Sequence, residues 1–161
     1  MLRGAAVFVA GVGILVAPSV EGWWARNTSE CAKLMTADDL VAIGGKQLEL
    51  ERAYHCDYFC DANYGYSAFV NLDQDTYHSD KDDQKWLEAA KKEGATVETI
   101  VEGSAWLALD GKDMHTLIVK REFGAAKIEL KKKDFTADQA RKLYPLLKDR
   151  FGPVDEYFAK K

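Results

Sequence analysis

The sequence predicts an α+β domain, built as an antiparallel sheet of about five or six strands with helices packed on one face. First, strand patterns occur in runs joined by turn sequences such as Asp110-Gly111. Second, helical patterns separate these runs instead of alternating with single strands. Third, 161 residues with 47% hydrophobic and 30% charged content suffice for a single core. We therefore expect one domain over residues 31–153.

The N-terminal residues are predicted to lie outside this domain. Arg3 supplies a positive charge before an apolar stretch that extends to Val20, and Pro18 breaks that stretch. This layout is typical of a signal peptide over residues 1–22, and the alternative is an uncleaved N-terminal membrane anchor. Residues 23–30 would form a linker and residues 154–161 a tail. The protein is expected to be secreted or to lie in the periplasm or cell envelope.

The first half of the domain is predicted to contain a short helix and two strands. Thr36 is a good N-cap for a helix that ends at Gly44-Gly45. Residues 47–58 alternate as a half-buried strand, with Tyr54, Cys56 and Tyr58 facing inward. Asp61 to Gly65 has turn composition, and residues 66–72 form the returning strand.

The second half is predicted to contain two helices separated by a meander of strands. A helix over Asp82 to Glu93 ends at Gly94. Alternating or continuous apolar patterns then predict strands at 96–101, 105–109, 114–120 and 127–131. A last helix begins after Thr136, where Gln139 completes a capping box. Pro145 predicts a kink or break near Tyr144.

Three cysteines in an exported protein indicate one disulfide and one remaining cysteine. If residues 54–60 are extended, Cys56 and Cys60 lie about 13 Å apart, too far to bond each other. Cys31 should then bond one of them. The alternative is that Cys60 begins a tight turn and bonds Cys56.

Several short motifs resemble those of a known family. They are the segment Cys31-Ala-Lys-Leu-Met-Thr-Ala-Asp-Asp-Leu40, then Gly44-Gly45, Cys56-Asp-Tyr58 and, more loosely, Ser104-Ala-Trp106 with the helix after Thr136. Together they resemble small secreted actinobacterial lipoproteins of unknown function and cover most of the mature chain. The resemblance implies a disulfide between Cys31 and Cys56, which would leave Cys60 as a free thiol. The chain departs from the family because it lacks a lipid-attachment cysteine.

The sequence offers little support for catalysis, metal binding or nucleic-acid binding. A net charge of -4 is unlike the basic surface of a nucleic-acid binder. Cys60 and His115 are a possible nucleophile and base, but no catalytic motif surrounds them, and no cofactor is predicted. His55, Cys60 and His78 are the alternative metal ligands. The run Lys131 to Lys133 is interpreted as a guard against edge pairing at a strand end.

Aromatic residues crowd one predicted hairpin, and they carry the functional hypothesis. Tyrosine gives a large, rigid contact area at low entropic cost, so we expect a partner-binding surface there. The candidate contact residues are Tyr58, Tyr64, Tyr66 and Phe69. The predicted function is a non-enzymatic binding module for a protein of the envelope or extracellular space, with membrane contact only through an uncleaved N-terminal segment. The alternative is a small-ligand or metal carrier, and a hydrolase is third.

Overall fold

The computed structural model describes residues 30–56, 59–73, 82–121 and 124–152. The predicted signal peptide, residues 23–29 of the predicted linker, the tail, Tyr58 and His78 lie outside the described residues. Glu30, expected to end the linker, instead begins the first helix. Among the described residues, no helix is long and apolar enough to cross a membrane.

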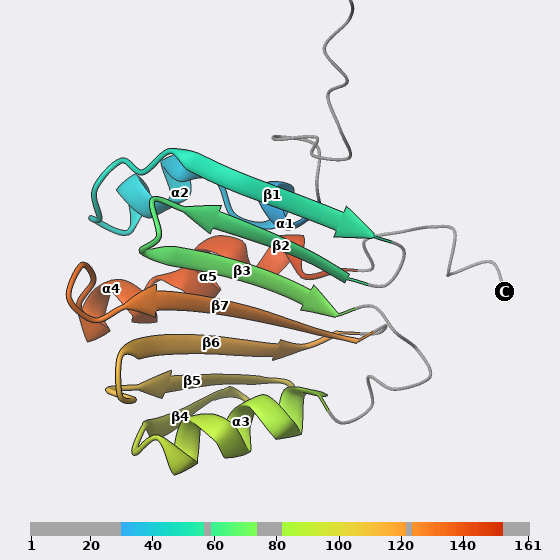
Figure 1. The fold of residues 1–161 in the computed structure, drawn as a ribbon. Coiled ribbons are helices and arrows are strands. Elements are labelled where there is room, and N and C mark those ends of the chain that lie inside the picture. The colour runs from blue at the N-terminus through green and yellow to red at the C-terminus, as the bar shows by residue number, and fades with distance from the viewer. Residues whose placement is uncertain (1–29, 57–58, 74–81, 122–123, 153–161) are drawn as a thin grey trace, which may run out of the picture.

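A seven-stranded antiparallel sheet forms the centre of the fold, which confirms the α+β class (Figure 1). The spatial order of its strands is β1-β2-β3-β7-β6-β5-β4. The strands are β1 (Leu50–Cys56), β2 (Phe59–Tyr64), β3 (Ala68–Asp73), β4 (Thr96–Val101), β5 (Ala105–Leu109), β6 (Met114–Lys120) and β7 (Ala125–Lys131).

The strand beyond the expected five or six is β2. The segment from Asp61 to Gly65 was predicted as a turn, but most of it lies in this strand, which pairs with β1 on one side and β3 on the other. Ala62 lies between Ala53 and Val70 in these ladders, and all three side chains are buried. Pairing on both sides and burial outweigh the turn preference of the local sequence.

The helices cover both faces of the sheet, so the prediction that they pack on one face is wrong (Figure 1). Trp106 and Ile118 pack with Leu87 of α3 (Asp82–Lys92), whereas Leu107 and Leu117 belong to the larger core on the other face. Because β5 and β6 are apolar on both faces, both faces need cover. The larger core lies against α1 (Glu30–Leu34), α2 (Ala37–Ala42), α4 (Ala137–Arg141) and α5 (Leu143–Leu147), and α3 (Asp82–Lys92) lies opposite.

A bulge in β1 changes which of its residues face the larger core. The ladder with β2 shifts register between Leu50 and Arg52. An extra residue at a bulge reverses the alternation that follows it. Ala53 is therefore buried, and Tyr54, which was expected to face inward, is only half-buried.

The predicted helix caps are confirmed. Thr36 accepts a hydrogen bond from the backbone of Asp39 and Thr136 accepts one from Gln139, each within a reciprocal capping box. The last helix divides at Lys142 into α4 and α5, as expected because Pro145 has no N–H to donate to the preceding turn. A short 3-10 helix follows over Lys148–Arg150.

The disulfide joins Cys31 to Cys60, with 5.9 Å between their Cα atoms. The pairing of Cys31 with Cys56, and the assignment of Cys60 as a free thiol, are therefore wrong. Cys60 shares its alternation with Ala62 and Tyr64, the buried positions of β2, and α1 packs against this strand. In the ladder between β1 and β2, Cys56 lies opposite Phe59, whereas Cys60 lies opposite His55. The bond fastens α1 to the second strand of the sheet.

Two polar contacts also join the N-terminal helical segment to the rest of the domain. The buried hydroxyl of Tyr64 donates a hydrogen bond to the carbonyl of Met35. Arg150 donates to both carboxylate oxygens of Asp39, at 2.5 and 2.9 Å. Burial alone would raise the pKa of Asp39, but hydrogen bonds from Arg150 and Thr36 outweigh it, and the pKa is lowered. The helices before and after the sheet are thus joined directly.

Candidate binding site at one end of the sheet

Three connecting segments meet at one end of the sheet, the left end in Figure 1. They are residues 65–67 between β2 and β3, residues 110–113 between β5 and β6, and residues 131–135 after β7. The amide of Lys131 donates to the carbonyl of Ser67 at 2.9 Å, and the amide of Lys132 donates to Asp113 at 3.0 Å. Backbone hydrogen bonds therefore hold the three segments side by side.

The first segment and the preceding Tyr64, residues 64–67 together, are called here the tyrosine turn. Gly65 and Tyr66 have φ angles of 54° and 52°, and the amide of Ser67 donates to the carbonyl of Tyr64. Positive φ at both central positions is the pattern of a type I′ turn, which favours glycine and asparagine. Gly65 fits this preference, but a tyrosine at the second position does not. The side chain of Tyr66 is also 63% exposed, so packing in the core does not explain its presence.

Phe69 and Lys131 extend this surface onto the face of the sheet opposite the larger core. The ammonium of Lys131 lies 5.6 Å from the centre of the Phe69 ring, within the range of a cation–π interaction. Phe69 is half-buried, and its partner position in β7 is Glu129. An aromatic ring and a positive charge are thus presented together next to the tyrosine turn, to which Lys131 is bonded through Ser67.

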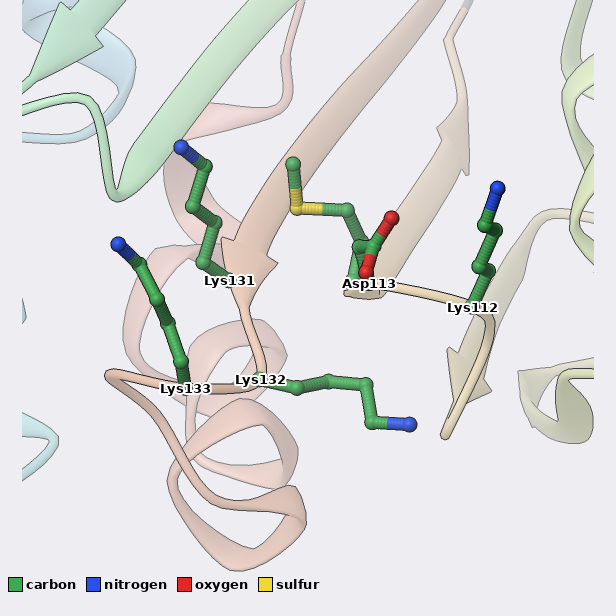
Figure 2. Close-up of a pocket in the computed structure, with 6 residues that line it drawn as sticks. Lys112, Asp113, Lys131, Lys132 and Lys133 are labelled. Atoms are coloured by element: carbon green, nitrogen blue, oxygen red, sulfur yellow. The ribbon is translucent and has the colours of Figure 1, made fainter.

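A basic hollow of about 400 Å³ lies between the connection from β5 to β6 and the segment that follows β7 (Figure 2). We call it the lysine hollow; its lining residues are Lys112, Asp113, Met114, Lys131, Lys132 and Lys133. None of its four lysines forms a salt bridge with a described residue. Lys132 donates instead to the carbonyl of Gly111, at 2.9 Å. The hollow therefore carries positive charge that the described residues leave largely uncompensated.

The predicted role of Lys131 to Lys133 as an edge guard does not fit the sheet. These residues end β7, which lies between β3 and β6 and is not an edge strand. Edge strands are the ones that need charged residues against pairing with other chains. The run therefore needs another explanation.

His115 connects the two lysine-bearing segments from inside the protein. Its side chain is buried, and Nδ1 accepts a hydrogen bond from the amide of Asp110 at 3.2 Å. Burial lowers the pKa of His115, against smaller opposing effects from the charge of Asp110 and a hydrogen bond to the backbone of Phe135. The lowered pKa favours the neutral imidazole, whose Nδ1 accepts from Asp110 and so supports the segment that carries Lys112.

The structure brings together only part of the predicted contact surface. Tyr66 is exposed and Phe69 is half-buried, but Tyr64 is 1% exposed and belongs to the core, so its assignment to the surface is wrong. Tyr64 ends β2 in phase with buried Ala62, whereas Tyr66 lies beyond the strand.

The predicted catalytic and metal-binding alternatives both lose Cys60. An oxidised cysteine supplies neither the thiolate nucleophile to act with His115 nor a thiolate ligand. The side chain of His55 lies outside the described residues, as does His78. Among the residues that are described, no three histidine, cysteine or acidic side chains gather as a metal site.

The sequence interpretation missed the lysine hollow. Its signals are the run of three lysines at the end of one strand and Lys112 directly after the Asp110-Gly111 turn. Only the pairing of β6 with β7, which places Met114 opposite Lys131, brings the two signals together.

Comparison with known proteins gives no independent assignment. The chain matches no protein-family model, no curated protein and no solved structure.

Proposed function

We propose that this protein is a non-enzymatic binding module outside the cytoplasm, and that it contacts a protein partner through the tyrosine turn and the adjoining Phe69. The surface is presented on a seven-stranded sheet with well-packed faces. Such a scaffold holds the turn in place before binding, which lowers the entropic cost of association.

The observation that carries this proposal is the conformation of Tyr66. A left-handed backbone costs a non-glycine residue of order 1–3 kcal/mol, and such residues cluster at functional sites. Tyr66 adopts this conformation and leaves most of its side chain in solvent, so neither the turn nor the core benefits from the ring. An exposed, rigid tyrosine is a favourable contact residue in protein interfaces.

The disulfide supports the proposed location. Bonds such as Cys31–Cys60 form and persist mainly in oxidising compartments, including the periplasm and the extracellular space. This agrees with the signal peptide or anchor expected from residues 1–22.

The alternative of a small-ligand carrier would use a hollow between the first helices and the sheet. It measures about 210 Å³ and is lined by Ala32, Thr36, Ala37, Leu50 and Tyr64. Sites for drug-sized molecules usually measure about 300–1,000 Å³ and are mostly apolar. This hollow is smaller than that, and the 400 Å³ lysine hollow is lined mainly by charged residues. We therefore favour the protein partner.

Photo-crosslinking in the organism that encodes the protein tests the proposal. A photoreactive phenylalanine analogue replaces Tyr66, and in a matched control it replaces Phe59. Phe59 is also a partly exposed aromatic residue, but it begins β2 and so lies at the other end of that strand. We expect one discrete adduct from position 66 and none of that mass from position 59.

Competition makes this test specific for the ring. Excess unlabelled wild-type protein should abolish the adduct, whereas excess Tyr66→Gly protein should not. Equal labelling from both positions, or no adduct from position 66, would contradict the proposal.

A further inference from the structure

We infer that the lysine hollow binds an acidic, extended peptide segment of the partner. This inference rests on the proposed function, because it assigns a chemistry to the partner that the tyrosine turn contacts. The hollow adjoins the turn, since Lys131 lines the hollow and its amide donates to the carbonyl of Ser67 in the turn. The ammonium of Lys131 also lies over the ring of Phe69.

The charge of the hollow is a local exception in an acidic protein. The whole chain has a formal net charge of -4, yet the hollow gathers four lysines and one aspartate. Asp134, which follows Lys133, accepts a hydrogen bond from Ser67 at 2.7 Å and is shared between the charges of Lys133 and of Lys46, which lies 3.7 Å away, so with Asp113 it offsets only part of the charge of the four lysines. Like charges held close together repel unless a ligand compensates them. Charge complementarity therefore points to a negatively charged occupant.

The directions of the lysines favour several spaced negative charges over a single anion. Lys131 and Lys133 extend toward the same side of the hollow, while Lys132 extends the other way (Figure 2). Lys132 is held there by its hydrogen bond to the carbonyl of Gly111. A single phosphate group is bound by donors that converge on its oxygens, and these ammonium groups diverge. Carboxylates spaced along an extended chain match this arrangement better.

The neighbouring side chains favour a peptide over a lipid or polysaccharide as the source of these carboxylates. Met114 lines the hollow, Phe69 contacts its Lys131, and the tyrosine turn is bonded to Lys131 through Ser67. Methionine and aromatic residues are enriched in protein interfaces, where a charged rim commonly surrounds them. We therefore place the acidic part of the partner in the hollow and an apolar part against the rings.

The test measures binding of a fluorescent peptide of ten glutamates to the full exported chain by anisotropy. The test variant is Lys131→Glu/Lys133→Glu. The matched control is Lys91→Glu/Lys92→Glu, because these exposed lysines lie on α3 and their replacement changes the net charge equally. We expect the test variant to bind at least about tenfold more weakly and the control to bind within about twofold of the wild type. Wild-type affinity should fall as salt rises.

A second variant guards against misfolding caused by the charge reversal. Lys112→Gln/Lys133→Gln introduces no negative charge, and circular dichroism and thermal melting establish that each variant is folded. It should also weaken binding of the ten-glutamate peptide, by several-fold. Equal losses in the test and control variants would overturn the inference, because the attraction would then be general.

Two further probes separate other sources of negative charge. Inorganic phosphate at millimolar concentration should not displace the peptide, and vesicles containing anionic phospholipid should not bind the protein. Displacement by phosphate, or vesicle binding that Lys131→Glu/Lys133→Glu abolishes while the peptide fails to bind, would overturn the inference in favour of an anion or membrane site.

The crosslinking experiment distinguishes failure of this inference from failure of the proposed function. If the adduct from position 66 persists in the Lys131→Glu/Lys133→Glu background, the partner does not depend on the hollow and the acidic-segment inference is wrong. The binding module itself would still stand in that case. If position 66 yields no adduct even with the lysines intact, the proposed function fails.

Discussion

Removal of the Cys31–Cys60 disulfide should cost about 3.5 kcal/mol of unfolding free energy. The two cysteines are separated by 29 residues, and the chain-entropy model assigns a crosslink of this span about 3.5 kcal/mol. The loss matters for α1, because this five-residue helix is far too short to be stable alone. It stays docked through the bond, through buried Ala32 and Leu34, and through neighbouring Met35.

The variant for this test is Cys31→Ala/Cys60→Ala, measured by urea unfolding and thermal melting. Both cysteines are fully buried, and alanine avoids placing a new polar group in the core. For a domain of this size, the expected loss corresponds to a melting temperature lower by roughly 10–15 °C. Reduction of the wild-type protein should produce a similar decrease.

Cys56→Ala is the control, because a bond between Cys31 and Cys60 leaves this residue outside the crosslink. Its unfolding free energy should lie within about 1 kcal/mol of the wild-type value. Peptide mapping without reduction should recover a fragment that links Cys31 to Cys60. A fragment linking Cys56 to either of them, or a double variant as stable as the wild type, would refute the reasoning.

Three further predictions concern single side chains. Asp39→Asn should lower the unfolding free energy by about 1–2 kcal/mol, because Arg150 loses a charged partner. The pKa of Asp39 is lowered in the fold, so this contribution is present above about pH 4 and is lost as the pH falls further. Urea unfolding should therefore show a smaller difference between variant and wild type at pH 3 than at pH 7. The pKa of His115 is also lowered, so its contribution to stability is complete above about pH 6.5 and declines as the pH falls below that value. His115→Asn keeps an acceptor for the amide of Asp110, and its unfolding free energy should depend less steeply on pH between 7.5 and 5.5. The same slope as in the wild type would contradict the structural role of His115. Tyr66→Gly should leave the unfolding free energy unchanged or raise it by up to about 1 kcal/mol, because relief of the left-handed backbone outweighs the added flexibility of the unfolded chain. A loss of more than about 1 kcal/mol would show that the ring stabilises the fold.

The parts of the fold that were predicted correctly depend on nearest neighbours in the chain. Thr36 and Thr136 act as caps because each hydrogen bond partner lies three residues away. The break at Lys142 follows from the missing N–H of Pro145. Helix α3 and strands β4 to β6 also lie where their patterns placed them. Interactions of such short range are encoded in short segments of sequence.

The candidate site was predicted in part. The exposed Tyr66 was among the predicted contact residues, but it lies in the turn and not in the returning strand where it was expected. The half-buried Phe69 lies in β3, as its place in that strand predicted. The assignment of Tyr64 failed because this residue is the buried last residue of β2, whereas Tyr66, two residues later, lies in the exposed turn. Aromatic composition alone does not distinguish a ring that fills the core from a ring that faces solvent.

The sequence by itself determined the antiparallel α+β class, the helix caps at Thr36 and Thr136, and most strands. Only the tertiary structure decided that α3 covers the second face, that Cys60 bonds Cys31, and that Lys112 joins Lys131 to Lys133 in one hollow. Each of these features depends on how strands and helices far apart in the sequence are brought together, and strand register sets the face that each residue occupies. Register arises from packing between segments far apart in the chain, and a shift of one residue reverses every side chain that follows.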